Sequence, residues 1–238
     1  MTASSADQKL SPVNFDDYSA VYDAALNEGL NVTGESKDYY ARERVRWLRS
    51  CLQELSEQPH GVMDYGCGDG SSSPLLLSLT KEGFVLGVDT SEHLLDLARN
   101  NHAGQRSNFC RIRDHEPQET LDLVYCNGVF HHIPPAERAS AVDYIWKSLR
   151  PGGIFALWEN NPWNPGTRYV MSRIPFDREA ATITPPKATS LMRKAGFKVL
   201  RCDSLFYFPR QLRFLRWIEP YLRKLPLGGQ YQLLCRKL

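Results

Sequence analysis

Short apolar runs alternate with stretches of helical periodicity through the middle of the chain. One helical stripe contains Leu94, Leu95 and Ala98, and Val142 and Trp146 belong to another. This alternation predicts a doubly wound α/β fold, in which helices cover both faces of a parallel sheet. The strands predicted in this part are residues 61–65, 84–89, 108–114, 121–130 and 153–159.

The two ends of the chain carry other patterns. Residues 1–13 are polar and are expected to be a disordered tail, whereas 14–58 combine helical spacing with many aromatic side chains. Prolines and asparagines in 160–170 predict a stiff loop. We therefore expect a single domain over residues 14–238. Its later elements are predicted as a helix at 187–195, a strand at 197–208, a helix at 211–224 and a strand at 228–238.

The segment 210–225 carries two stripes in the helical projection. Its leucines predict packing against the sheet. Phe214, Trp217 and Tyr221 form the second stripe, which leaves pocket lining, a dimer contact and a membrane-surface contact open. Pro220 interrupts the helix and argues against the membrane contact.

Composition and charge exclude several classes of protein. The chain has 42% hydrophobic residues and a formal net charge of +2, which is too balanced for a general nucleic-acid binder. No apolar run reaches the roughly 18 residues of a membrane span, and the first residues do not resemble a signal peptide. The six cysteines form no C-x-x-C pair, so no metal site is expected. We expect a cytoplasmic monomer or homodimer.

Three glycines follow the first predicted strand at alternate positions. Gly66, Gly68 and Gly70 would let the backbone approach a ligand at the carboxyl edge of the sheet. The dinucleotide fingerprint G-x-G-x-x-G/A fails at Ser71, and the carboxylate of Asp64 would oppose a pyrophosphate. A cationic ligand suits Asp64 better, although the loop alone does not separate the two kinds of ligand.

Two further aspartates end the next two predicted strands. Asp89 and Asp114 follow Asp64 at intervals of 25 residues, so the three carboxylates should lie along one edge of the sheet. Three acids on one edge favour a ligand with positive charge, hydroxyls and an exocyclic amine. Each aspartate has a plainer alternative, as a cap or turn residue.

Residues 61–160 resemble the class I S-adenosylmethionine-dependent methyltransferases. The resemblance rests on "VMDYGCGDG", "GVDTS", "RDHEP", "VYCNGVFHHIP" and "SLRPGGIFALWE". It implies a seven-stranded sheet of order 3-2-1-4-5-7-6 with the last strand antiparallel. It also implies S-adenosyl-L-methionine as the cofactor, a helical lid at 14–58, a cofactor core at 61–160 and a substrate-side segment at 161–238.

The resemblance assigns residues to parts of the cofactor. Gly66 and Asn127 would contact its methionyl end, Asp64 its amino group, Asp89 its ribose and Asp114 its adenine amine. Cys67 sits where many relatives have cysteine, and it is interpreted as a small packing residue rather than a nucleophile. The full set expected at the cofactor is Asp64, Gly66, Cys67, Gly68, Asp89, Thr90, Asp114, His115, Asn127 and the lid residue Tyr22.

Three residues are candidates for catalysis on the acceptor side. His131 and His132 follow the fourth strand, where one would be a general base or both would have packing duties in the loop. Glu159 ends the fifth strand as a base, a substrate anchor or a loop support.

The expected reaction is methyl transfer to an O or N atom of a small acceptor, such as a natural product, a quinone or lipid-like compound, or a sugar. A methyltransferase for protein or RNA, and a non-catalytic cofactor-binding module, are the alternatives. Enzymes of this fold that methylate amino groups of nucleic acids carry an Asn/Asp-Pro-Pro-aromatic stretch after the fourth strand. The stretch "NNPWNP" follows the fifth strand instead, and this position argues against amino methylation of nucleic acid.

Overall fold

The computed structural model describes residues 26, 28–178 and 180–238. Within them, seven strands form one sheet of order β3-β2-β1-β4-β5-β7-β6, and β7 runs antiparallel to both of its neighbours. This confirms the predicted sheet order. The strands are β1 (Gly61–Tyr65), β2 (Phe84–Asp89), β3 (Ser107–Arg111), β4 (Leu121–Asn127), β5 (Leu149–Asn160), β6 (Lys198–Leu205) and β7 (Gln230–Arg236).

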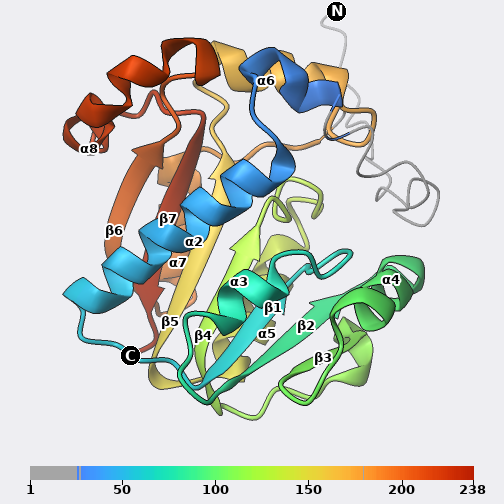
Figure 1. Cartoon of the computed structure of the whole chain (residues 1–238). Helices are drawn as coiled ribbons and strands as arrows, with labels where there is room; N and C mark the ends of the chain where they lie inside the picture. Colours follow the sequence, from blue (N-terminus) through green and yellow to red (C-terminus); the bar gives the residue numbers. More distant parts are fainter. Residues whose placement is uncertain (1–25, 27, 179) are drawn as a thin grey trace, which may run out of the picture.

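Helices cover both faces of the sheet, as predicted. Helices α2 and α3 lie across one face, and α5 and α7 lie behind the other (Figure 1). The α-helices of the described chain are α2 (Lys37–Glu54), α3 (Ser73–Leu77), α4 (Glu92–His102), α5 (Arg138–Ser148), α6 (Pro165–Arg173), α7 (Pro185–Lys194) and α8 (Glu219–Leu222). Shorter 3-10 segments are η2 (Asn31–Thr33), η3 (Ile112–Asp114) and η4 (Arg210–Ile218).

The core has two layers, one on each side of the central strands. Leu48 and Leu52 of α2 pack with Val62 and Leu123 on one side, and α5 and α7 pack against the other. Strands β1, β4 and β5 are buried on both faces, which explains why their sequences are nearly continuous apolar runs.

Side-chain caps fix where several helices begin. The hydroxyl oxygen of Ser36 accepts a hydrogen bond from the backbone N–H of Tyr39 at the start of α2. Ser91 caps α4 in the same way, and Asn164 caps α6. These caps satisfy N–H groups that have no partner inside the helix.

Several segments differ from the sequence-based expectation. Strand β3 ends at Arg111 and not at 114, so Asp114 lies in the exposed 3-10 segment η3 beyond the strand end. Part of the loop predicted over 160–170 forms α6, since Asn164 and Pro165 together make a favourable helix start. The predicted helix at 211–224 is η4 followed by α8, because Pro220 has no N–H to continue a regular helix.

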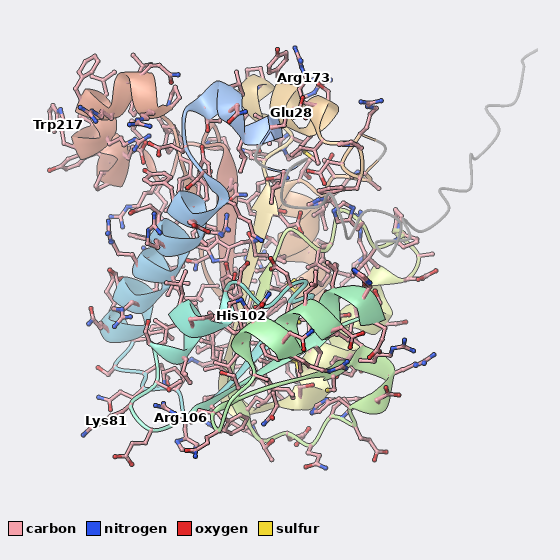
Figure 2. The ribbon with its side chains drawn as sticks, turned by 45° about the vertical axis from the view of Figure 1, so that its right-hand side comes forward. Glu28, Lys81, His102, Arg106, Arg173 and Trp217 are labelled. Carbon is pink, nitrogen blue, oxygen red and sulfur yellow. The ribbon has the colours of Figure 1, made fainter. Side chains whose placement is uncertain are left out.

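The stripes of the segment 210–225 are largely solvent-exposed, so the predicted packing of its leucines is wrong for Leu212 and Leu225. Trp217 is 71% exposed, and Figure 2 shows it at the outer side of this segment. No helix in the described part of the chain is long and apolar enough to cross a bilayer.

The carboxyl ends of the parallel strands lie at the edge where segments from other parts of the chain gather. Helix α6, the segment before α2, and the η4–α8 segment cover this edge (Figure 1). Glu28 and Arg173 lie there, whereas Lys81 and Arg106 lie at the opposite end (Figure 2). This covered edge is where a ligand of an open α/β sheet is expected.

Candidate functional site

The glycine loop after β1 has the backbone conformation that its sequence predicts. Gly66, Gly68 and Gly70 have φ angles of 74°, 54° and 74°, in the left-handed region that favours glycine. A Cβ on Gly66 would lie 2.3 Å from Val129 Cγ2, whereas a Cβ on Gly68 would point into open space. The loop therefore exposes backbone at Gly68 and packs tightly at Gly66.

Asp89 holds this loop to the next element. Its Oδ2 accepts a hydrogen bond from the Gly68 N–H at 2.8 Å, and its Oδ1 accepts one from the Ser91 N–H at 3.0 Å. The side chain is buried at the end of β2. Asp89 thus shapes the loop, and its contact with a ribose stays a prediction.

Asp64 is a buried carboxyl group with an orphaned oxygen. Its side chain is 3% exposed, and Oδ2 has no hydrogen-bond partner among the described residues. Burial, together with the neighbouring Asp89 and Asp69 carboxylates, raises the pKa of Asp64 to about 8. A positively charged hydrogen-bond donor would relieve both the desolvation and the repulsion.

Asn127 offers a second such oxygen at the end of β4. Its Oδ1 is buried and has no partner within the described chain. Strand β4 pairs with β1 in parallel, with Asp64 opposite Tyr125, so Asn127 lies just beyond the same edge. Two orphaned acceptors beside a loop of exposed backbone fit the amino group of S-adenosylmethionine, which donates hydrogen bonds.

Arg44, in α2, is a site residue that no motif in the sequence marks. It is buried, and it donates to Tyr125 Oη at 3.2 Å and to Gln230 Oε1 at 3.1 Å. Among the described residues, no carboxylate forms an ion pair with it. A buried guanidinium with only neutral partners suits a carboxylate ligand.

A cavity of about 360 Å³ brings two of these groups together with the predicted acceptor residues. Arg44 and Asn127 line it, and so do His131, His132 and Asp177. Its volume lies within the range of sites that bind small molecules.

The two histidines meet one carboxylate from a distant segment. His131 Nε2 lies 3.4 Å from Asp177 Oδ1, and His132 Nε2 lies 3.2 Å from the same oxygen. Asp177 lies between α6 and α7 and is not among the residues predicted from the sequence. Only the fold brings it to the histidines, and no local motif marks it.

Glu159 lies behind His131 and does not line the cavity. It is 0% exposed, and its Oε2 lies 2.6 Å from His131 Nδ1. Its Oε1 accepts a hydrogen bond from the Phe130 N–H at 2.7 Å. The expectation that Glu159 faces the acceptor pocket is therefore wrong, because both of its oxygens are used within the protein. It positions His131.

Burial and charge move the pKa values of this cluster apart. Burial opposes the charge on His131, but Glu159 and Asp177 outweigh it and raise the pKa of His131 to about 10. Burial and the neighbouring His131 lower the pKa of His132 below its usual value. At neutral pH, His131 is the charged member of the pair and His132 is the neutral one.

The other predicted cofactor residues lie in varied surroundings. Cys67 is buried, and burial raises the pKa of its thiol well above the usual value, which agrees with a packing role. Thr90 and Asp114 are exposed, and His115 Nδ1 lies 2.7 Å from Tyr144 Oη. Tyr22 lies outside the described residues. Contacts of these residues with the cofactor stay predictions.

We expect Asp89→Ala to weaken cofactor binding by about 1–3 kcal/mol, through the loss of charge-assisted hydrogen bonds. Calorimetric titration with S-adenosylmethionine measures the change, and Asp96→Ala on the exposed side of α4 is the control. Unchanged affinity in a folded Asp89→Ala protein would remove Asp89 from the binding site.

Comparisons with known proteins find similarity to methyltransferases. Residues 63–155 match a family described as "Methyltransferase domain". Trans-aconitate 2-methyltransferase of Methylobacterium nodulans is 30% identical over 159 residues, which are 66% of this chain and 61% of that protein. The chain thus spans less than two thirds of that relative's length. Ubiquinone biosynthesis O-methyltransferase of Coxiella burnetii is 27% identical over 199 residues, covering 77% of this chain and 82% of that protein.

A solved structure shows the same fold. An S-adenosylmethionine dependent methyltransferase from Mesorhizobium loti has a TM-score of 0.55 and 20% identity, over 74% of this chain and 90% of its own. The sheet order, the glycine loop between acidic strand ends and these relatives agree with one another. Residues 63–155 thus match a methyltransferase domain, and the described chain has the fold of a solved S-adenosylmethionine-dependent methyltransferase.

Proposed function

We propose that the protein transfers a methyl group from S-adenosylmethionine to an oxygen or nitrogen atom of a small-molecule acceptor. The observation that carries this proposal is the orphaned buried oxygen of Asn127 in the wall of a cavity that the histidine cluster also lines. The second orphaned oxygen, on Asp64, belongs to the neighbouring strand β1. Asn127 and His131 both line that cavity, so the cofactor end and the acceptor end share one space.

The side chains at the glycine loop bind and orient the cofactor. When bound, its sulfonium supplies an electrophilic methyl group, and transfer is an in-line displacement. Asp64 and Asn127 accept hydrogen bonds from the amino group, and Arg44 binds the carboxylate at the same end. These contacts fix the direction in which the methyl group points, which is the main contribution a protein makes to such a reaction.

The size and lining of the cavity support a small acceptor. At about 360 Å³ it suits a compact molecule, and the aromatic side chains of Tyr40, Phe176 and Phe206 line it beside the polar groups. The names of two relatives refer to trans-aconitate, a carboxylic acid, and to ubiquinone biosynthesis. Either kind of acceptor would present an oxygen atom.

The histidine cluster supports an acceptor that must lose a proton. His131 is charged at neutral pH and cannot accept one, whereas the neutral His132 can. Glu159 and Asp177 hold the two rings in place from opposite sides of His131. An oxygen nucleophile that is protonated in water would be activated here.

The proposal is tested by incubating the protein with methyl-labelled cofactor and a fractionated pool of small metabolites, including carboxylic acids and phenols. We expect label in a small molecule, with one S-adenosylhomocysteine formed per methyl group transferred, and little label with Asp89→Ala. Transfer only to protein or RNA would contradict the small acceptor. Tight cofactor binding without any transfer would favour a non-catalytic binding module.

A further inference from the structure

Two imidazoles and one carboxylate converge at the cavity wall. The Nε2 atoms of His131 and His132 lie 3.4 and 3.2 Å from Asp177 Oδ1, and the three ligand atoms all lie within 4.8 Å of one another. Atoms that bind one metal ion at about 2.0–2.2 Å stand roughly 3–3.5 Å apart. The 3.2 Å contact lies within the range of an N–H···O hydrogen bond and the 3.4 Å contact lies beyond it, and both distances also match the spacing of two atoms that bind one ion.

Glu159 contacts the ring nitrogen of His131 that does not face Asp177. Its Oε2 lies 2.6 Å from His131 Nδ1, on the side of the ring opposite to Asp177. A histidine that binds a metal through one ring nitrogen commonly donates its other N–H to a carboxylate, which fixes the tautomer and raises the basicity of the ligand. The Phe130 N–H holds Glu159 itself in place at 2.7 Å.

The charges at this point also favour a cation. Glu159 is 0% and Asp177 7% exposed, and buried carboxylates are paired or coordinate metals. Without an ion, the proton on His131 balances part of this negative charge. A dication that replaces this proton would balance both carboxylates. His131, His132 and Asp177 also line the cavity, so an ion bound by them has positions open to a ligand.

We propose that His131, His132 and Asp177 bind a divalent transition-metal ion at the acceptor end of the cavity. Two nitrogen donors and one carboxylate suit zinc, iron, cobalt or nickel, whereas magnesium and calcium prefer oxygen ligands. This differs from the sequence-based expectation of no metal site, because that expectation used cysteine spacing, and these ligands come from two distant segments.

The role of the ion rests on the proposed function, but its binding does not. An ion with open positions acts as a Lewis acid and lowers the pKa of a bound hydroxyl group. An acceptor hydroxyl or carboxyl oxygen on the ion would thus be held as the anion beside the methyl group. With the ion bound, His132 would be a ligand and not the base. The proton would leave to solvent or buffer, and no oxidant or reductant is required.

The experiment titrates metal-stripped protein with cobalt(II), without cofactor or acceptor, and follows its visible absorption. We expect one cobalt ion per chain with the spectrum of a low-coordinate N,O site, displacement by an equivalent of zinc, and no displacement by magnesium. Failure of this titration would overturn the metal site and leave the methyl-transfer proposal intact, since cofactor binding is measured separately.

Three variants make the result specific. Asp177→Asn should weaken cobalt binding at least about 10-fold, and Glu159→Gln about 10–100-fold, because it removes the partner that orients His131. His102→Asn, at the end of α4 (Figure 2), should leave binding unchanged. Thermal melting confirms that each variant is folded, and zinc should raise the melting temperature of the wild type but not that of Asp177→Asn. Cobalt binding that survives Asp177→Asn, or that His102→Asn abolishes, would overturn the proposal.

Discussion

Asp64→Asn is expected to remove a pH-dependent loss of stability from the cofactor-free protein. In the folded chain the pKa of Asp64 is raised from its ordinary value of 3.8 to about 8, so the unfolded chain loses this proton first. The wild-type free energy of unfolding should therefore fall as the pH rises from about 4 to about 8, and this contribution should level off above pH 8. Between pH 5 and pH 8 the variant should gain on the order of 3 kcal/mol relative to the wild type.

Denaturant unfolding of the two proteins at several pH values measures this gain. A fixed cost of burying the asparagine amide does not change with pH, so the growing difference between the curves isolates the carboxyl group. Asp96→Asn, on the exposed side of α4, should follow the wild-type curve at every pH. Wild-type and Asp64→Asn curves that stay parallel would show that the fold does not perturb the carboxyl group.

Glu159→Gln is expected to lower kcat on the order of 100-fold while leaving the affinity for the cofactor unchanged. The carboxylate accepts from both the Phe130 N–H and His131 Nδ1. Glutamine can accept only through its oxygen, so one of these donors would face an NH₂ group and His131 would lose its orientation. In the described part of the chain, the Glu159 side chain hydrogen-bonds to Phe130 and His131 and not to Asp64, Asn127 or Arg44, so the contribution of these cofactor groups should persist.

Steady-state kinetics with the acceptor found in the labelling screen, together with calorimetric titration of the cofactor, separates the two effects. Glu82→Gln changes an exposed carboxylate in the turn before β2 and should leave both quantities unaltered. A Glu159→Gln protein with normal kcat and weakened cofactor binding would move Glu159 from the acceptor side to the cofactor side.

The sheet and the glycine loop could be predicted because their signals are local. Buried parallel strands are nearly continuous apolar runs, and β1 and β2 begin and end where the pattern places them. The positive φ angles of Gly66, Gly68 and Gly70 belong to a sharp strand-to-helix turn, and residues with a side chain rarely adopt such φ angles. The positions of Asp64 and Asp89 at strand ends follow from the strands themselves.

The acceptor end could not be predicted because it depends on long-range contacts. Asp177 reaches His131 and His132 from a segment 45 residues or more along the chain, and no spacing rule links them. The role of Arg44 depends on Tyr125 and Gln230, which only the fold brings together. Glu159 was placed at the correct strand end, but whether its side chain enters the cavity depends on the packing around Phe130 and His131.

The central claim is that acidic strand ends and a loop of exposed backbone bind a cationic adenosine compound. Calorimetric titration of the wild-type protein with S-adenosylmethionine, S-adenosylhomocysteine and NAD tests it most directly. We expect saturable binding of the first two ligands at one site per chain, and no heat of binding with NAD. Binding of NAD in the absence of any binding of S-adenosylmethionine would contradict it.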